Sequence, residues 1–68
     1  MEKQMIDNIY TYHAPNKEKT DIYTSLRQEA KRLANKINKS CPESREKDQA
    51  LLKLEEVVMW ANASIARN

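Results

Sequence analysis

The sequence contains no glycine among its 68 residues, although glycine makes up about 7% of an average protein. Gly-rich phosphate loops, the dinucleotide-binding fingerprint and the tightest β-hairpin turns all need glycine at fixed positions. The sequence therefore excludes the common nucleotide-binding loops. No stretch shows the alternation of apolar and polar residues that is typical of strands. We therefore predict an all-α protein.

Cysteine and histidine are almost as scarce, with one residue of each kind. Cys41 has no partner for an internal disulfide, and a single thiol suits a reducing cytosol better than secretion. His13 has no cluster of further metal ligands around it in the sequence. No apolar run approaches the roughly 20 residues that span a bilayer, and no signal peptide is recognisable. We expect no membrane segment, no metal and no cofactor.

The first half of the chain predicts two helices. Residues 1–12 form a short amphipathic segment, and a helix of two turns must dock on another surface because it is unstable alone. Pro15 disfavours helix at the residue before it. Asn16 is a good N-cap for a long helix that starts at Lys17 and ends at about Asn38.

The second half predicts one more long helix. Residues 39–44 break the helical pattern. Ser40 and Glu43 have capping-box spacing, and Ser44 is an equally plausible N-cap. The last helix then covers about residues 45–66. A short connection between two long helices predicts an antiparallel hairpin.

Each long helix has one apolar stripe at helical spacing. The predicted inner residues are Ile22, Leu26, Ala30, Leu33 and Ile37 on the first long helix, and Ala50, Leu54, Val57, Ala61 and Ile65 on the second.

The end of the last helix is apolar nearly all round, since only Asn62 and Ser64 are polar between Val57 and Ala66. A helix that is apolar on every side must be buried, and a chain of this length has too little else to cover it. We therefore expect residues 1–68 to form a single helical oligomerising domain. Other copies of the chain would cover the last helix in a compact homo-oligomer.

Positive charge is concentrated on the first long helix, although the net charge is only +2. Arg32, Lys36 and Lys39 lie far from the apolar stripe and indicate a solvated face. Arg27 and Lys31 lie at the edge of the stripe, one turn apart, and Tyr23 lies one turn before Arg27. Cations beside a buried seam with aromatic residues nearby can hold an anion. Their long side chains can equally cover apolar surface.

Catalytic patterns are weak in this sequence. Glu55 and Glu56 are adjacent, so they point in different directions on a helix. Cys41 and His13 have no evident third group that would orient the histidine. The balanced charge is too even for strong binding to a DNA or RNA polymer. We predict that the protein is not an enzyme.

Three local motifs carry a resemblance to a known family. They are Tyr12-His13-Ala14-Pro15, Cys41-Pro42-Glu43-Ser44-Arg45-Glu46, and the C-terminal Met59-Trp60-Ala61-Asn62-Ala63-Ser64-Ile65-Ala66-Arg67-Asn68. Together they make the chain resemble the small phage anti-CBASS cyclic-nucleotide sponges. CBASS is a bacterial defence in which infection triggers synthesis of cyclic oligonucleotides that activate a killing effector.

The resemblance implies a helical hexamer that acts in the cytoplasm of the infected bacterial host. Such proteins sequester cyclic dinucleotides such as 3′,3′-cGAMP in pockets between two chains, some also bind cyclic trinucleotides, and they do not cleave them. It implies that Tyr12 stacks on a base and that Arg27, or alternatively Lys31, contacts phosphate. From the chemistry of these residues we expect a pocket that uses Tyr12 and Arg27 from one chain, with Tyr23 or His13 nearby, and that is enclosed between protomers. Further candidate ligand residues, for a cyclic trinucleotide, are Asn62 and Arg67.

Structural interpretations of the same residues remain open. Tyr12 can be a packing contact at a helix entry, and Trp60 is expected in the core of the oligomer. Asn62 can fix helix register in a buried seam, and Arg67 can interact with the carboxyl end of its own helix. His13 is expected to support the turn through a ring hydrogen bond, with a contact to a base as the alternative.

Two other functions compete with the sponge. The first is a small helical phage protein that grips a host protein through its apolar C-terminal helix; it predicts a monomer or dimer that binds no nucleotide. The second is an enzyme that degrades cyclic nucleotides; it predicts linear products after incubation, whereas a sponge releases its ligand intact.

Overall fold

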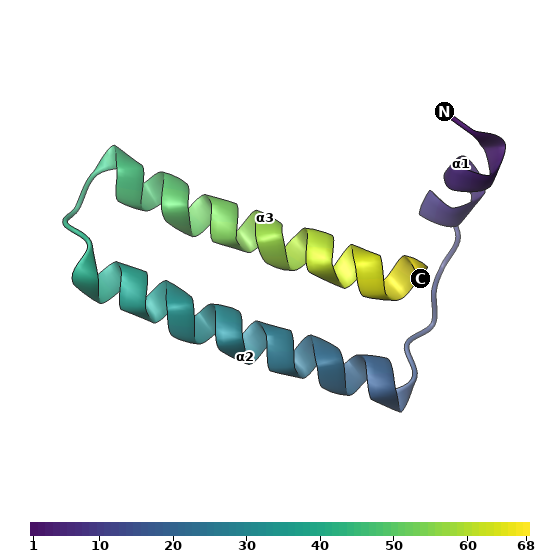
Figure 1. Cartoon of the computed structure of the whole chain (residues 1–68), viewed down its shortest axis with the longest axis horizontal. Coiled ribbons are helices and arrows are strands. Elements are labelled where there is room, and N and C mark those ends of the chain that lie inside the picture. Colours follow the sequence, from purple (N-terminus) through teal and green to yellow (C-terminus); the bar gives the residue numbers. More distant parts are fainter.

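The computed structural model describes all 68 residues as three helices without strands: α1 (Lys3–Ile9), α2 (Lys17–Ser40) and α3 (Arg45–Arg67). Figure 1 shows α2 and α3 side by side and antiparallel, with the short α1 beyond the open end of this hairpin. The predicted all-α class and the predicted order of one short and two long helices are confirmed. Both long helices end within two residues of the predicted positions, which is the usual uncertainty of helix ends.

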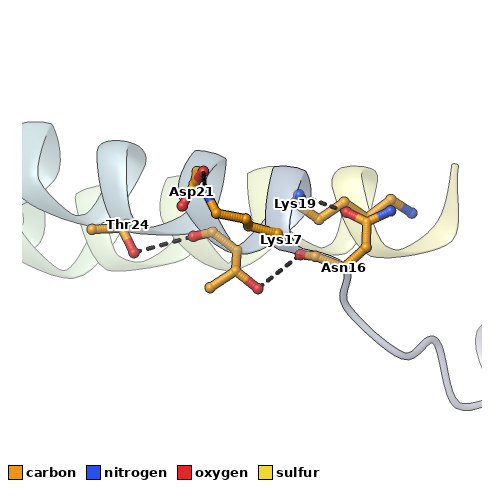
Figure 2. Close-up of polar contacts among 6 residues, drawn as sticks. Asn16, Lys17, Lys19, Asp21 and Thr24 are labelled. Atoms are coloured by element: carbon orange, nitrogen blue, oxygen red, sulfur yellow. Dashed lines mark hydrogen bonds and ion pairs between the residues drawn. The ribbon is translucent and has the colours of Figure 1, made fainter.

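The start of α2 is capped as predicted. The Asn16 side-chain oxygen accepts a hydrogen bond from the backbone N–H of Lys19 at 2.8 Å (Figure 2). The carbonyl of Asn16 accepts from both the backbone N–H and the hydroxyl of Thr20, each at 2.9 Å. An ion pair between Lys17 and Asp21 lies on the same turn at 3.1 Å. These contacts fix where the linker ends and α2 begins.

At the other end of the hairpin, Ser44 is the N-cap of α3, which decides between the two predicted caps. Its hydroxyl oxygen accepts from the backbone N–H of Lys47 at 3.1 Å. The Lys47 side chain extends across the loop and donates to the carbonyl of Asn38 at 3.0 Å and to the carboxylate of Glu43. Only 5% of Lys47 is exposed. A cation at the carboxyl end of α2 is favoured by the helix dipole, so Lys47 stabilises the closed end of the hairpin.

The inner stripe of α3 was predicted with two errors. Leu54, Ala61 and Ile65 are half-buried as expected, but Ala50 and Val57 are exposed. Leu51 and Val58 are half-buried instead. The observed set, residues 51, 54, 58, 61 and 65, follows the alternating three- and four-residue spacing that keeps one seam against a partner helix. This set also places Leu51 in the seam instead of the predicted Ala50, so a larger apolar side chain is covered.

A similar shift affects α2. Leu26, Ala30 and Ile37 are half-buried, whereas Ile22 and Leu33 are exposed. Tyr23 and Ala34, each one residue further along, are half-buried in the seam. The predicted set has helical spacing, but at two positions it is offset by one residue from the face that contacts α3. Several faces of α2 carry apolar residues at helical spacing, and only contact with α3 decides which face is covered.

The chain is a single layer of helices, with extents of 45 × 30 × 12 Å along its principal axes. No apolar side chain is fully buried, and Trp60 and Met59 are 59% and 57% exposed. Two helices alone leave their outer faces uncovered. A single chain therefore exposes the apolar surface that the sequence predicted to be buried. No helix is both long enough and apolar enough to cross a membrane.

Candidate ligand-binding surfaces

The linker between α1 and α2 presents Tyr12 to solvent. Its side chain makes no hydrogen bond, and the residue is 84% exposed. The neighbouring His13 is half-buried, and its ring Nε2 donates to the carbonyl of Asn8 at 2.8 Å. The prediction that His13 supports the turn through a ring hydrogen bond is confirmed. An exposed aromatic ring on a held backbone can stack on a planar ligand.

Arg27 and Lys31 lie along one face of the hairpin. They flank an open groove of about 410 Å³ whose apolar lining includes Leu51, Leu54 and Val58. This volume lies within the range of small-molecule sites. Neither Arg27 nor Lys31 forms an ion pair, although Glu55 lines the same groove. Two unpaired cations beside apolar side chains can hold a ligand that carries both negative charge and apolar surface.

A second open groove, of about 690 Å³, lies between the same helices and is lined by Arg32, Lys36 and Leu33 among others. The sequence predicted Arg32 and Lys36 on a solvated face far from the apolar stripe. Both are exposed, but they stand at the rim of an apolar groove. Arg32 is paired with Glu29 at 3.0 Å. The two grooves thus differ in whether the arginine at the rim is already neutralised.

A single chain does not bring the predicted dinucleotide residues together. Arg27 lies eleven residues beyond the N-cap of α2, which is about 16 Å along the helix at 1.5 Å per residue. The segment that carries Tyr12 instead runs past the open end of the hairpin (Figure 1). Tyr23 is half-buried and lies one turn from Arg27 on α2. The expectation that Tyr12 and Arg27 of one chain share a pocket is therefore wrong, and a pocket that uses both needs them from different chains.

The two candidate residues on α3 are half-buried near its end. The side-chain oxygen of Asn62 is buried and has no hydrogen-bond partner. A buried acceptor without a donor is unfavourable, and Asn62 is the one residue of the chain with such a side-chain atom. The carbonyl of Arg67 accepts from the side chain of Asn8 at 3.4 Å.

Sequence reasoning missed Asn8 and Lys47. Each makes a hydrogen bond that depends on where a neighbouring helix ends, as Lys47 does with the carbonyl of Asn38. The position of Lys47 in the first turn of α3, near a predicted helix end, was the signal that could have revealed it. No group of three or more His, Cys, Asp or Glu side chains lies close enough together to hold a metal ion.

Among known proteins, the chain matches one family. A family model described as Acb2/Tad1, hairpin domain, matches residues 1–66. No curated protein and no solved structure matches the chain. The match covers α1, α2 and all of α3 except Arg67, and it confirms the resemblance to this family that the sequence motifs carried.

Proposed function

The chain belongs to the Acb2/Tad1 hairpin-domain family, and we propose that it sequesters cyclic oligonucleotide messengers without cleaving them. The family is associated with phage anti-CBASS sequestration of cyclic nucleotides and consists of binding proteins rather than enzymes. For this chain the proposed ligands are cyclic dinucleotides such as 3′,3′-cGAMP, with cyclic trinucleotides as a further class. By lowering the free messenger in the cytoplasm of the infected host, the protein blocks activation of the CBASS effector.

The strongest support for this proposal is that the chain carries both an exposed aromatic ring, Tyr12, and two unpaired cations, Arg27 and Lys31. A cyclic dinucleotide has two bases and two phosphate charges. Stacking on Tyr12 contributes roughly 1–3 kcal/mol per base. A hydrogen bond from Arg27 to phosphate contributes about 1.5–3 kcal/mol. Lys31, one turn further along the groove, is the alternative phosphate contact, and His13 and Tyr23 complete the proposed surroundings.

The exposed apolar surface supports assembly into a homo-oligomer, for which the proposed state is a hexamer of single-domain chains. Large exposed apolar patches mark interaction surfaces, and here they include Trp60 and Met59. Tyr12 and Arg27 lie apart in one chain, so the dinucleotide pocket lies between two protomers. A symmetric interface suits a nearly symmetric ligand, because the same side chains contact each half. Enclosure between protomers also removes water and strengthens the phosphate contact.

Asn62 and Arg67 form the proposed trinucleotide surface. The unpartnered oxygen of Asn62 supports this, because a ligand amino group can supply the missing donor once the buried side chain turns outward. A second chain can supply the same donor. Trinucleotide titration of Asn62→Ala separates the two: a ligand contact predicts lower affinity with unchanged assembly, and a contact between chains predicts altered assembly.

The apolar outer face of α3 also favours a second candidate, a module that binds a host protein. Trp60 and Met59 are the side chains that such a partner would cover. This candidate predicts a monomer or dimer in solution and no heat on addition of any cyclic nucleotide.

Titration calorimetry with 3′,3′-cGAMP tests the proposal, with Arg32→Ala as the matched control for Arg27→Ala. We expect Arg27→Ala to weaken binding about 10- to 150-fold, and Tyr12→Ala roughly 5- to 150-fold. Arg32 is already paired with Glu29, so Arg32→Ala should leave the affinity within about twofold. Unchanged affinity in both Tyr12→Ala and Arg27→Ala with intact assembly would reject the site.

Recovery of the nucleotide distinguishes a sponge from an enzyme. After heat denaturation of the complex, chromatography should return the cyclic ligand intact. Linear products would overturn the sponge, and absence of heat with both dinucleotides and trinucleotides would favour the protein-binding module.

A further inference from the structure

The segment that carries Tyr12 is fastened to the last turn of α1. A helix leaves its final four carbonyls without partners inside the helix. Here three of them are satisfied by the segment of residues 10–13. The carbonyl of Ile6 accepts from the backbone N–H of the residue at position 10, at 3.1 Å. The carbonyl of Asp7 accepts from the hydroxyl of Thr11, and that of Asn8 accepts from the ring of His13 at 2.8 Å.

Asn8 also makes the only hydrogen bond that joins α1 to the hairpin. Its side-chain Nδ2 donates to the carbonyl of Arg67 at the end of α3, at 3.4 Å, and this bond is partly buried. Figure 1 shows α1 close to this end of α3. Asn8 thus makes both connections: its carbonyl holds the linker at His13, and its side chain holds the end of the hairpin at Arg67.

Tyr12 lies between the two linker residues whose side chains are fastened to α1. Thr11 and His13 fix the backbone on both sides of it, while the ring of Tyr12 stays exposed and without a hydrogen bond. A ring that is free on a held backbone needs little further ordering when a base stacks on it. Ordering before binding increases affinity because less entropy is lost in the complex.

We propose that Asn8 is a positioning residue for ligand binding, which acts by holding the Tyr12 segment against the end of α3 and need not touch the ligand. This inference rests on the proposed function, in which Tyr12 stacks on a base of a cyclic dinucleotide. It assigns to α1, a helix of seven residues, the task of setting where the stacking ring stands relative to the hairpin.

A double-mutant cycle between Asn8 and Tyr12 tests this inference, with 3′,3′-cGAMP as the ligand. Without the Asn8 bond, we expect the linker to hold Tyr12 in the position that binds ligand in only about a tenth of the molecules. Asn8→Ala should then weaken binding about 10-fold. The same substitution in a Tyr12→Leu background should have an effect of less than about twofold, because coupled residues are not additive. Gln4→Ala is the matched control, since Gln4 is exposed on the same helix and its side chain forms no hydrogen bond.

A second pair of variants keeps the test valid if Asn8→Ala disturbs folding or assembly, which circular dichroism and size-exclusion chromatography would reveal. Thr11→Val removes the hydroxyl that bonds to Asp7 and keeps the shape of the side chain, whereas Thr11→Ser keeps the hydroxyl. We expect weaker binding only for Thr11→Val. Amide ¹⁵N relaxation without ligand should show increased motion at residues 10–13 in Asn8→Ala and Thr11→Val, but not in Gln4→Ala.

Failure of this inference and failure of the proposed function give different results. If the unmodified protein binds no cyclic nucleotide, the proposed function fails and the inference with it. If the unmodified protein binds and Tyr12→Leu weakens binding, equal affinities for Asn8→Ala and Gln4→Ala overturn the inference alone. The inference is also overturned if the losses of binding free energy in Asn8→Ala and Tyr12→Leu are additive in the double variant.

Discussion

The closed and open ends of the hairpin use polar side chains in opposite ways. At the closed end, Lys47 is almost fully buried, and Ser44 caps the next helix. At the open end, Tyr12 is exposed and unbonded, and a single long hydrogen bond between Asn8 and Arg67 joins α1 to the hairpin. Polar groups that are buried and satisfied hold the fold. Groups that are held in place but left exposed are available to a ligand.

The largest effect is expected at Trp60, a large apolar residue that is exposed on α3. Trp60→Lys places a charge in the surface that we propose other copies cover, and burying an unpaired charge is very costly. We expect analytical ultracentrifugation to show loss of the oligomer at micromolar concentration. Gln49→Lys, an exposed polar position on the same helix, should leave the oligomer intact. An unchanged oligomer in Trp60→Lys would place Trp60 outside the interface.

The next effect concerns the closed end. Lys47→Met keeps much of the side-chain volume but leaves the carbonyl of Asn38 without its donor, which should lower the free energy of unfolding by about 1–3 kcal/mol. Glu43→Gln is the control and should change stability by less than about 1 kcal/mol, because the Glu43 side chain is 86% exposed. Urea unfolding at one fixed protein concentration measures both, since the stability of an oligomer depends on concentration. If Glu43→Gln lowered the free energy of unfolding more than Lys47→Met does, this account of the closed end would be contradicted.

The cap at the open end should contribute less. Asn16→Ala removes the acceptor for the backbone N–H of Lys19, and loss of an N-cap typically costs about 1 kcal/mol. Asn16→Asp retains an acceptor and should preserve stability. Thermal unfolding followed by circular dichroism compares the two variants. Equal midpoints for Asn16→Ala and the unmodified protein would show that the cap contributes nothing.

The smallest effect is expected one turn into the same helix. Asp21→Asn breaks the exposed ion pair with Lys17, and such pairs contribute about 0–1 kcal/mol. We expect a change in thermal midpoint that is smaller than that of Asn16→Ala and that disappears in high salt. A change larger than that of the cap would reverse the ranking of these neighbouring interactions.

Much of the fold could be predicted from the sequence because its signals are local. Asn16 before a helical pattern and the break around Pro42 located the long helices to within two residues. The face of α3 that meets α2 was harder to predict, since Val57 and Val58 are chemically equal and only pairing with the partner helix decides between them. The buried position of Lys47 was not predicted for a similar reason, because the carbonyl of Asn38 that accepts its hydrogen bond lies on another helix.

The candidate site was predictable only in part. The turn role of His13 follows from short-range contacts, and the structure confirms it. Tyr12 and Arg27 were proposed as one pocket, but a single chain holds them apart. Whether they meet depends on how chains pack together, and neither local pattern nor one chain contains that information.

Native mass spectrometry of the protein with 3′,3′-cGAMP tests the central claim most directly, because one spectrum reports both assembly and ligand. The account predicts an oligomer, proposed to be a hexamer, that carries whole cyclic dinucleotides and releases them with unchanged mass on activation. Monomers or dimers without bound nucleotide would contradict it. So would a released nucleotide heavier by one water, the mark of hydrolysis.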